Sequence, residues 1–220
     1  MNPILKSIQI TLNNTGHDCG DVDGLTGIKT AEALSKAILD KTISFSCKQH
    51  VDLKKSLVDA TPTRRNIEDV YGVISYKDVG DRGAIKITNA TKWRKHFTRI
   101  DVVATDDMTP IPLTVNKKIA LNVLCAFAEI KLHNDTLPKD ERWTPKRVDS
   151  YCPRHNRWDQ RRPLSVHTWA AAIDIDPKTN GVKMDGDIPE WVIEILQSWA
   201  AVWGGDWRKY PDPMHFQWMR

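Results

Sequence analysis

Apolar residues recur with helical spacing in the first 60 positions. Residues 4–12 carry isoleucine and leucine on one side of a predicted helix, and the polar, glycine-containing segment 13–16 ends it. A loop with three glycines follows, and residues 28–38 place apolar side chains on one side of a second helix. A third, shorter helix is predicted near residues 51–57. The pattern therefore predicts a small helical unit at the N-terminus.

The pattern changes after the polar, proline-containing stretch at residues 60–66. All nine tryptophans lie at or after Trp93, so the composition shifts as well as the periodicity. A polar stretch between two such regions is typical of a linker. We predict a three-helix domain over residues 1–60, a linker over residues 61–72 and a larger domain over residues 73–220.

The larger domain mixes helical and strand patterns. Residues 74–99 are too irregular for a prediction. The remaining predicted elements are a strand at 99–104, a helix at 116–132, a strand at 170–175, a helix beginning at Pro189 and a strand at 214–218. Strands and helices in separate blocks predict an α+β fold, with a small antiparallel sheet flanked by helices.

Charge and hydropathy exclude some classes of function. The formal net charge of +4 is spread along the 220 residues, so no basic block indicates nucleic-acid binding. No apolar run approaches the roughly 18–20 residues that cross a bilayer, and the N-terminus lacks the pattern of a secretory signal. We therefore expect a protein that first accumulates in a cytoplasm, without stable membrane insertion. Its four cysteines form no Cys-x-x-Cys pair, and reduced thiols are expected.

Three residues of the larger domain match the ligand set of a catalytic zinc site. Such sites take three protein ligands from histidines and carboxylates, and His167, Asp174 and His215 supply that set. Their donor atoms must lie within roughly 4 Å of one another. A helix would separate His167 from Asp174 by about 10 Å and a strand by more than about 20 Å. The chain must therefore turn between these two residues.

Amide hydrolysis also needs a proton-transferring carboxylate and a cation that stabilises negative charge. Zinc lowers the pKa of bound water to about 7. Asp212, close in sequence to the last histidine, is the candidate that takes the proton from this water. Arg154 and Arg157 are candidates for binding an oxyanion or a substrate carboxylate, and Arg154 is preferred.

Four blocks of the larger domain resemble one family of zinc peptidases. They are Tyr151-Cys152-Pro153-Arg154, Ser165-x-His167-x-Trp169 with Ala172-Ile173-Asp174-Ile175-Asp176-Pro177, Trp203-Gly204-Gly205-Asp206-Trp207 and Asp212-Pro213-Met214-His215-Phe216. In this order they are similar to the D-alanyl-D-alanine carboxypeptidase family, and within it to the bacteriophage endolysin branch of L-alanyl-D-glutamate endopeptidases. The resemblance covers roughly residues 75–220 and implies an α+β zinc peptidase domain.

The resemblance also implies roles for individual residues. His167, Asp174 and His215 would bind Zn²⁺, Asp212 would be the catalytic base, and Arg154 would contact the substrate.

Three further residues within the blocks, Ser165, Trp169 and Trp207, are expected to contact the substrate. For the tryptophans, burial in the core is the alternative. The chain departs from the family at Ala170, where glycine is usual. If this position has a positive φ, alanine costs about 1 kcal/mol or more there.

The N-terminal helices resemble a second family. Asp23-Gly24-x-x-Gly27-x-x-Thr30-x-x-Ala33 is similar to the core motif of three-helix peptidoglycan-binding domains. In the alternative interpretation, the glycines only shape the turn and Thr30 only supports the start of the helix.

Both resemblances imply peptidoglycan as the partner. They imply a monomeric phage endolysin that stays in the host cytoplasm until a membrane-disrupting protein releases it, and then hydrolyses a stem-peptide bond, L-alanyl-D-glutamate. A D-alanyl-D-alanine carboxypeptidase is the first alternative. A non-catalytic wall-binding protein is the second.

Overall fold

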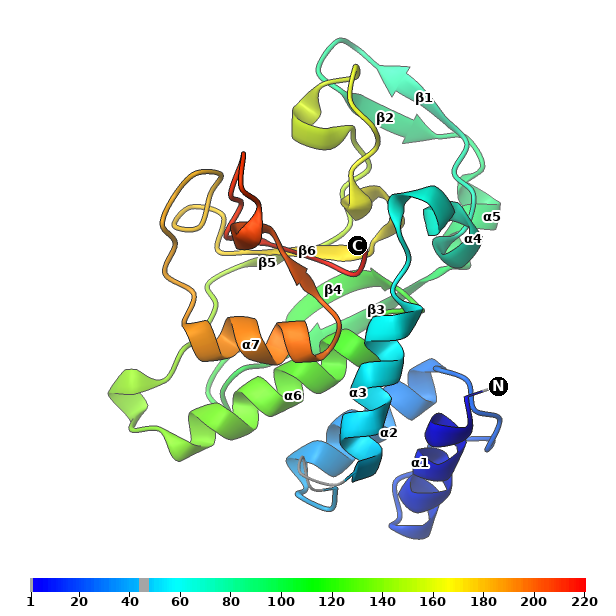
Figure 1. The fold of residues 1–220 in the computed structure, drawn as a ribbon, viewed down its shortest axis with the longest axis vertical. Helices are drawn as coiled ribbons and strands as arrows, with labels where there is room; N and C mark the ends of the chain where they lie inside the picture. The colour runs from blue at the N-terminus through cyan, green and yellow to red at the C-terminus, as the bar shows by residue number, and fades with distance from the viewer. Residues whose placement is uncertain (1, 44–47) are drawn as a thin grey trace.

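Seven α-helices and eight β-strands are found in a computed structural model that describes residues 2–43 and 48–220 (Figure 1). The helices are α1 (Pro3–Asn14), α2 (Ile28–Leu39), α3 (Lys48–Ala60), α4 (Ile67–Tyr71), α5 (Ala90–Arg94), α6 (Ala120–Thr136) and α7 (Glu190–Ser198). The strands are β1 (Tyr76–Val79), β2 (Ala84–Ile87), β3 (Phe97–Val102), β4 (Ile111–Asn116), β5 (Val148–Asp149), β6 (Ala172–Ile175), β7 (Val202–Trp203) and β8 (His215–Gln217). Within this part of the chain, no helix has the length and apolar character needed to span a membrane.

The strands form three small antiparallel sheets. Two are hairpins, β1–β2 and β3–β4, and the third has four strands in the order β5-β6-β8-β7. In this third sheet, Asp174 of β6 lies directly opposite His215 of β8. The fold is α+β with small antiparallel sheets beside helices, as the sequence predicts.

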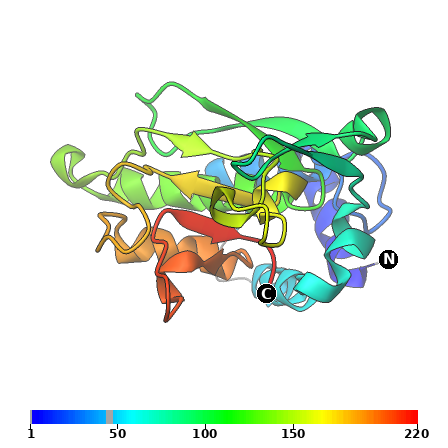
Figure 2. The same ribbon diagram turned by 90° about the horizontal axis from the view of Figure 1, so that it is seen from above.

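The first part of helix α6 lies in the core, where every residue from Ala120 to Ile130 except Leu124 is buried. Buried residues such as Leu121, Val123 and Phe127 point to different sides, and a helix that is apolar all round is a buried helix. It packs against α2, α7 and β3. In the turned view of Figure 2, α1 and α3 gather at one end, while the strands β6 and β8 cross the middle.

The residues of the N-terminal glycine motif have structural roles. The side chain of Gln9, buried in α1, donates to Asp23 Oδ1 and Thr30 Oγ1 and accepts the Gly24 backbone N–H. Gly24 has a φ of 71°, and a Cβ there would lie 2.8 Å from the Asn2 carbonyl oxygen. A glycine is therefore required at this turn by both its conformation and its close approach.

The N-terminal helices and the rest of the chain share one apolar core. Lys54 on α3 forms an ion pair of 2.7 Å with Glu129 on α6 and donates to Ser198 Oγ at the end of α7. Ser35 on α2 donates to the Leu124 carbonyl oxygen. These polar contacts join elements that are far apart in sequence.

The segment predicted as a linker, residues 61–72, is folded. It contains a short 3₁₀ helix, η1 (Arg64–Asn66), followed by α4. At its end, the buried Tyr71 hydroxyl donates to the Trp218 carbonyl oxygen. Near its start, the Arg220 N–H donates to the Pro62 carbonyl oxygen. Contacts with the C-terminal residues therefore fix both ends of this segment.

The predicted helices and strands are present, with shifted bounds for β3 and α6. The irregular region 74–99 contains β1, β2 and α5, and β4 is a further element that the periodicity does not indicate. Of the four cysteines, Cys19, Cys125 and Cys152 are free thiols. Cys47 lies outside the described residues.

Candidate metal centre

Three different elements hold the predicted metal ligands. His167 lies on a 3₁₀ helix, η4 (Val166–Trp169), Asp174 lies on β6, and His215 lies on β8. Between the first two, Ala170 adopts left-handed geometry with φ 52° and ψ 34°. This residue ends η4 and reverses the chain into β6, which provides the turn that a shared metal requires. The positive φ is also the condition under which alanine is strained at this position.

The three donor atoms converge on one point. Asp174 Oδ1 lies 3.0 Å from His167 Nε2 and 2.9 Å from His215 Nδ1, and the two nitrogens are 3.2 Å apart. Ligands about 2.0–2.1 Å from a tetrahedral zinc ion lie about 3.3–3.4 Å from one another. The observed separations are only slightly shorter. His167, Asp174 and His215 form the group of metal-ligating side chains (His, Cys, Asp or Glu) that, within the described residues, lies closely enough together to hold a metal ion.

Hydrogen bonds on the outer side of each imidazole fix which nitrogen faces the site. His167 Nδ1 contacts the Ser150 carbonyl oxygen at 2.5 Å, so this nitrogen carries the proton and Nε2 offers a lone pair. His215 Nε2 contacts Gln217 Oε1 at 3.1 Å, which leaves the Nδ1 lone pair toward the site. The Gln217 amide N–H donates in turn to the Met219 carbonyl oxygen, which sets the amide orientation. Metal-binding histidines are typically oriented by such outer partners.

The electrostatics of the site favour a cation. Burial alone would raise the pKa of Asp174, but its close contacts with the imidazoles of His167 and His215 outweigh this effect and hold the pKa far below its usual range. Burial alone would lower the pKa of His215, but its contact with the Asp174 carboxylate raises it instead. A buried carboxylate that stabilises positive charge, beside two imidazole lone pairs, fits Zn²⁺.

Asp212 lies beside the ligands, and one of its carboxylate oxygens has no hydrogen-bond partner. Its Oδ1 is buried and has no hydrogen-bond partner, although buried polar atoms nearly always have one. Burial raises the pKa of this carboxyl, and the nearby His215 partly opposes the shift. Its backbone is fixed by the turn into β8, in which the Asp212 carbonyl oxygen accepts the His215 N–H. An unpartnered carboxylate oxygen next to a metal site can accept a proton from water.

Gly204 permits this placement of Asp212. A Cβ at position 204 would lie 2.6 Å from the Asp212 carbonyl oxygen and 3.1 Å from the His215 Cβ. The Trp203-Gly204-Gly205 block therefore holds the loop of Asp212 against β8.

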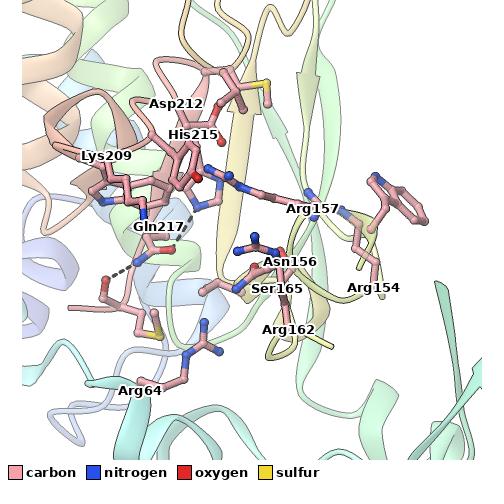
Figure 3. Close-up of a pocket in the computed structure, with 17 residues that line it drawn as sticks. Arg64, Arg154, Asn156, Arg157, Arg162, Ser165, Lys209, Asp212, His215 and Gln217 are labelled. Carbon is pink, nitrogen blue, oxygen red and sulfur yellow. Dashed lines mark hydrogen bonds between the residues drawn. The ribbon is translucent and has the colours of Figure 1, made fainter. Parts of the chain in front are cut away.

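A pocket of about 660 Å³ opens onto His215 and Asp212 (Figure 3). Its size is within the range of small-ligand sites. Asp212 is the only acidic side chain among the described residues that line it, whereas five basic side chains do so, namely Arg64, Arg154, Arg157, Arg162 and Lys209. The pocket therefore suits a substrate with negative charge.

Both candidate arginines, Arg154 and Arg157, line this pocket. Arg157 reaches across it, and its guanidinium carbon lies 3.6 Å from the centre of the Tyr210 ring (Figure 3). Arg154 lies 5.4 Å from the Trp158 ring, and its positive charge lowers the pKa of Asp212 against the effect of burial. The geometry brings both arginines to the site, so the preference for Arg154 stays a prediction.

The three predicted substrate contacts lie in different environments. Trp207 lines the pocket, with its ring 5.3 Å from that of His215. Ser165 also lines it, but its hydroxyl accepts the His167 N–H and caps η4. Trp169 corrects the prediction because its side chain is only 3% exposed and its indole N–H donates to the Gly72 carbonyl oxygen. It therefore belongs to the core, the alternative that the sequence left open.

Several residues of the site were not predicted. Gln217 could have been found, because residues two apart on a strand share a face and His215 was a predicted ligand. Ser150 contributes only a backbone oxygen, so its side chain gives no signal. Arg64 is about 100 residues from the ligands in sequence and enters the pocket only through the tertiary fold.

An α+β fold, a His–Asp–His ligand set and a carboxylate beside it with an unpartnered oxygen are the features of a metal-dependent hydrolase. Residues 158–218 match the family model described as D-alanyl-D-alanine carboxypeptidase. This segment contains the three ligands and Asp212, so the match supports a metallopeptidase that acts on cell-wall peptides. No curated protein and no solved structure matches the chain.

Proposed function

We propose that the chain is a zinc endopeptidase that hydrolyses a stem-peptide bond of peptidoglycan. The observation that carries the proposal is the convergence of three lone-pair donors beside the unpartnered Oδ1 of Asp212. Both features lie in the segment that matches the D-alanyl-D-alanine carboxypeptidase model.

His167, Asp174 and His215 would hold the zinc ion. When bound, zinc supplies a Lewis acid that activates water and polarises a carbonyl group. Asp212 Oδ1 accepts a proton from the attacking water and delivers it to the leaving amine nitrogen, so one carboxylate serves both halves of the reaction. Arg154 or Arg157 binds a substrate carboxylate or the developing oxyanion. Trp207 forms part of the wall beside His215.

The scissile bond that we propose is L-alanyl-D-glutamate. The description of the matching family favours a second candidate, removal of the terminal D-alanine from the stem peptide. The pocket is consistent with either substrate because both carry carboxylates, and its lining is basic.

Peptide mapping of digested sacculi tests the proposal and separates the two candidates. An endopeptidase of the proposed type releases peptides with a new N-terminal glutamate, whereas a carboxypeptidase releases only D-alanine. Chelation should abolish both products, and added zinc should restore them. Asp212→Asn should reduce turnover by at least about 100-fold while zinc stays bound. Full turnover by this variant would contradict the role of Asp212.

We also propose that the N-terminal helices attach the enzyme to the wall. Attachment raises the effective concentration of a catalytic site near an insoluble substrate. In this proposal the chain acts as a monomeric phage endolysin that accumulates in the host cytoplasm and reaches the wall after the membrane is disrupted. Binding of the intact protein to purified sacculi, measured by sedimentation in the presence of chelator, tests the attachment.

A further inference from the structure

Arg64 enters the pocket from outside the segment that contains the ligands. It lies on η1, between the N-terminal helices and the sheet, and its side chain lines the pocket. Figure 3 shows Arg64 at the opposite end of the pocket from Asp212. A group bound to Arg64 would therefore belong to a part of the substrate that is remote from the reacting bond.

The position of Arg64 is fixed on both sides. Its Nη1 donates to the Leu164 carbonyl oxygen at 2.9 Å. At the start of η1, the N–H and the hydroxyl of the capping residue Thr63 both donate to Asn66 Oδ1, which closes the turn around Arg64. The contact between Arg220 and Pro62 holds the preceding residues. A guanidinium held in this way needs little reorganisation to bind a ligand.

The charge of Arg64 is not balanced by the described part of the protein. The hydrogen bond to Leu164 uses one of five guanidinium N–H donors, and no carboxylate among the described residues forms an ion pair with Arg64. Arg162, another basic residue of the pocket, differs because it is paired with Asp159 at 3.5 Å. Free donors of a planar guanidinium that face a cavity suit the two oxygens of a carboxylate.

We propose that Arg64 binds a substrate carboxylate remote from the scissile bond, and so selects stem peptides in which that carboxylate is free rather than amidated. This inference rests on the proposed function, since it assigns a second anionic group to the same peptide. Asp212 and His215 define the reacting end of the pocket, and Arg64 defines the other. The substrate class is therefore an acidic peptide several residues long.

Two stem peptides test the proposal; they differ only at the residue after the glutamate, whose side-chain carboxylate is free in one peptide and amidated in the other. For wild type, kcat/KM should be higher with the free carboxylate. Arg64→Gln should lower kcat/KM for that peptide by about 10- to 100-fold and leave the amidated peptide within about twofold. For the free-carboxylate peptide, kcat/KM of Arg64→Lys should lie between the values of wild type and Arg64→Gln, because lysine keeps the charge but lacks the planar guanidinium. The matched control is Arg65→Gln, an exposed neighbour on η1 that does not line the pocket.

Calorimetric titration of both peptides into zinc-loaded Asp212→Asn protein, with and without Arg64→Gln, gives a readout independent of turnover. The proposal is supported if Arg64→Gln weakens binding of the free-carboxylate peptide but not of the amidated peptide. The proposal would be overturned if Arg64→Gln lowered the affinity for both peptides equally or for neither, or if Arg65→Gln lowered it by the same factor. If wild type cleaves neither peptide, the proposed function fails, while the titration still decides whether Arg64 recognises the carboxylate.

Discussion

Gln217 offers the sharpest test of the metal centre because it touches His215 on the side away from the other ligands. Its Oε1 accepts the His215 Nε2–H at 3.1 Å, and its amide N–H donates to the Met219 carbonyl oxygen at 2.8 Å. Gln217→Leu removes both contacts and keeps a side chain of similar size. The variant leaves His167, Asp174 and His215 in the chain and changes only what orients the last of them.

Two effects of different size follow from this substitution. Loss of an outer partner lowers metal affinity by about 10- to 100-fold, or about 1.4–2.8 kcal/mol, because the imidazole no longer holds the required tautomer and orientation. Stability of the metal-free protein should fall by about 1–3 kcal/mol, because the His215 Nε2–H and the Met219 carbonyl lose their partners in a buried strand. The stability of zinc-loaded Gln217→Leu should therefore reflect both the weaker zinc binding and the lower stability of the metal-free protein.

Competition with a chromophoric chelator measures the zinc affinity, and circular dichroism during thermal unfolding measures the stability. The matched control is Gln197→Leu on α7, because Gln197 donates to Asp206 on the surface and does not contact the ligands. That variant should bind zinc like wild type. If folded Gln217→Leu binds zinc with an affinity within about twofold of wild type, the hydrogen bond from Gln217 that orients His215 does not determine metal binding, and the reasoning is refuted.

Three further predictions follow from particular contacts. Gly204→Ala should slow hydrolysis by about 10- to 100-fold, because a Cβ 2.6 Å from the Asp212 carbonyl oxygen must displace that residue; steady-state rates of the folded variant check this. Ala170→Gly should change the free energy of unfolding, measured by denaturant titration, by less than about 1 kcal/mol. The substitution relieves about 1–2 kcal/mol of left-handed backbone strain. This gain is offset by the loss of about 0.8 kcal/mol of methyl burial and by the added entropy of the unfolded chain. Burial raises the pKa of Tyr71 well above its ordinary value of 10.0, so the unfolded state loses this proton at a lower pH than the folded state does. The free energy of unfolding should therefore fall above about pH 10, by up to about 1.4 kcal/mol per pH unit. Tyr71→Phe should lack this additional slope when unfolding is measured across that range.

The sequence predicts the elements whose burial follows a regular period. Helices α1 and α2 have one apolar side, and β6, which is apolar except for Asp174, matches a strand that is buried throughout. For α6 the predicted range of 116–132 begins too early, because Asn116 ends β4 and uses its side chain to bind the Tyr71 and Trp169 carbonyl oxygens. Periodicity cannot indicate that Asn116 belongs to β4 and that residues 117–119 form the turn before α6.

Elements without a buried face escape prediction for the same reason. All four residues of β1 are exposed, so the strand has no alternation of apolar and polar positions. The metal ligands were predictable because their chemistry restricts them to a few residue types. Arg64 was not, because arginine is common on surfaces and only the contact of η1 with Leu164 brings it to the pocket.

The shared core also determines how attachment to the wall can be tested. Helix α2 covers α6, and the ion pair between Lys54 and Glu129 joins α3 to α6. Deletion of residues 1–60 would expose the apolar side of α6 and remove the Lys54 ion pair of Glu129, so loss of activity would report misfolding as well as lost attachment. Substitutions at exposed positions of α1 and α2, in the intact chain, avoid this. If such variants keep the wild-type melting temperature and hydrolyse soluble peptide normally but bind sacculi weakly, the helices attach the enzyme to the wall; if none weakens binding, the attachment proposal is wrong.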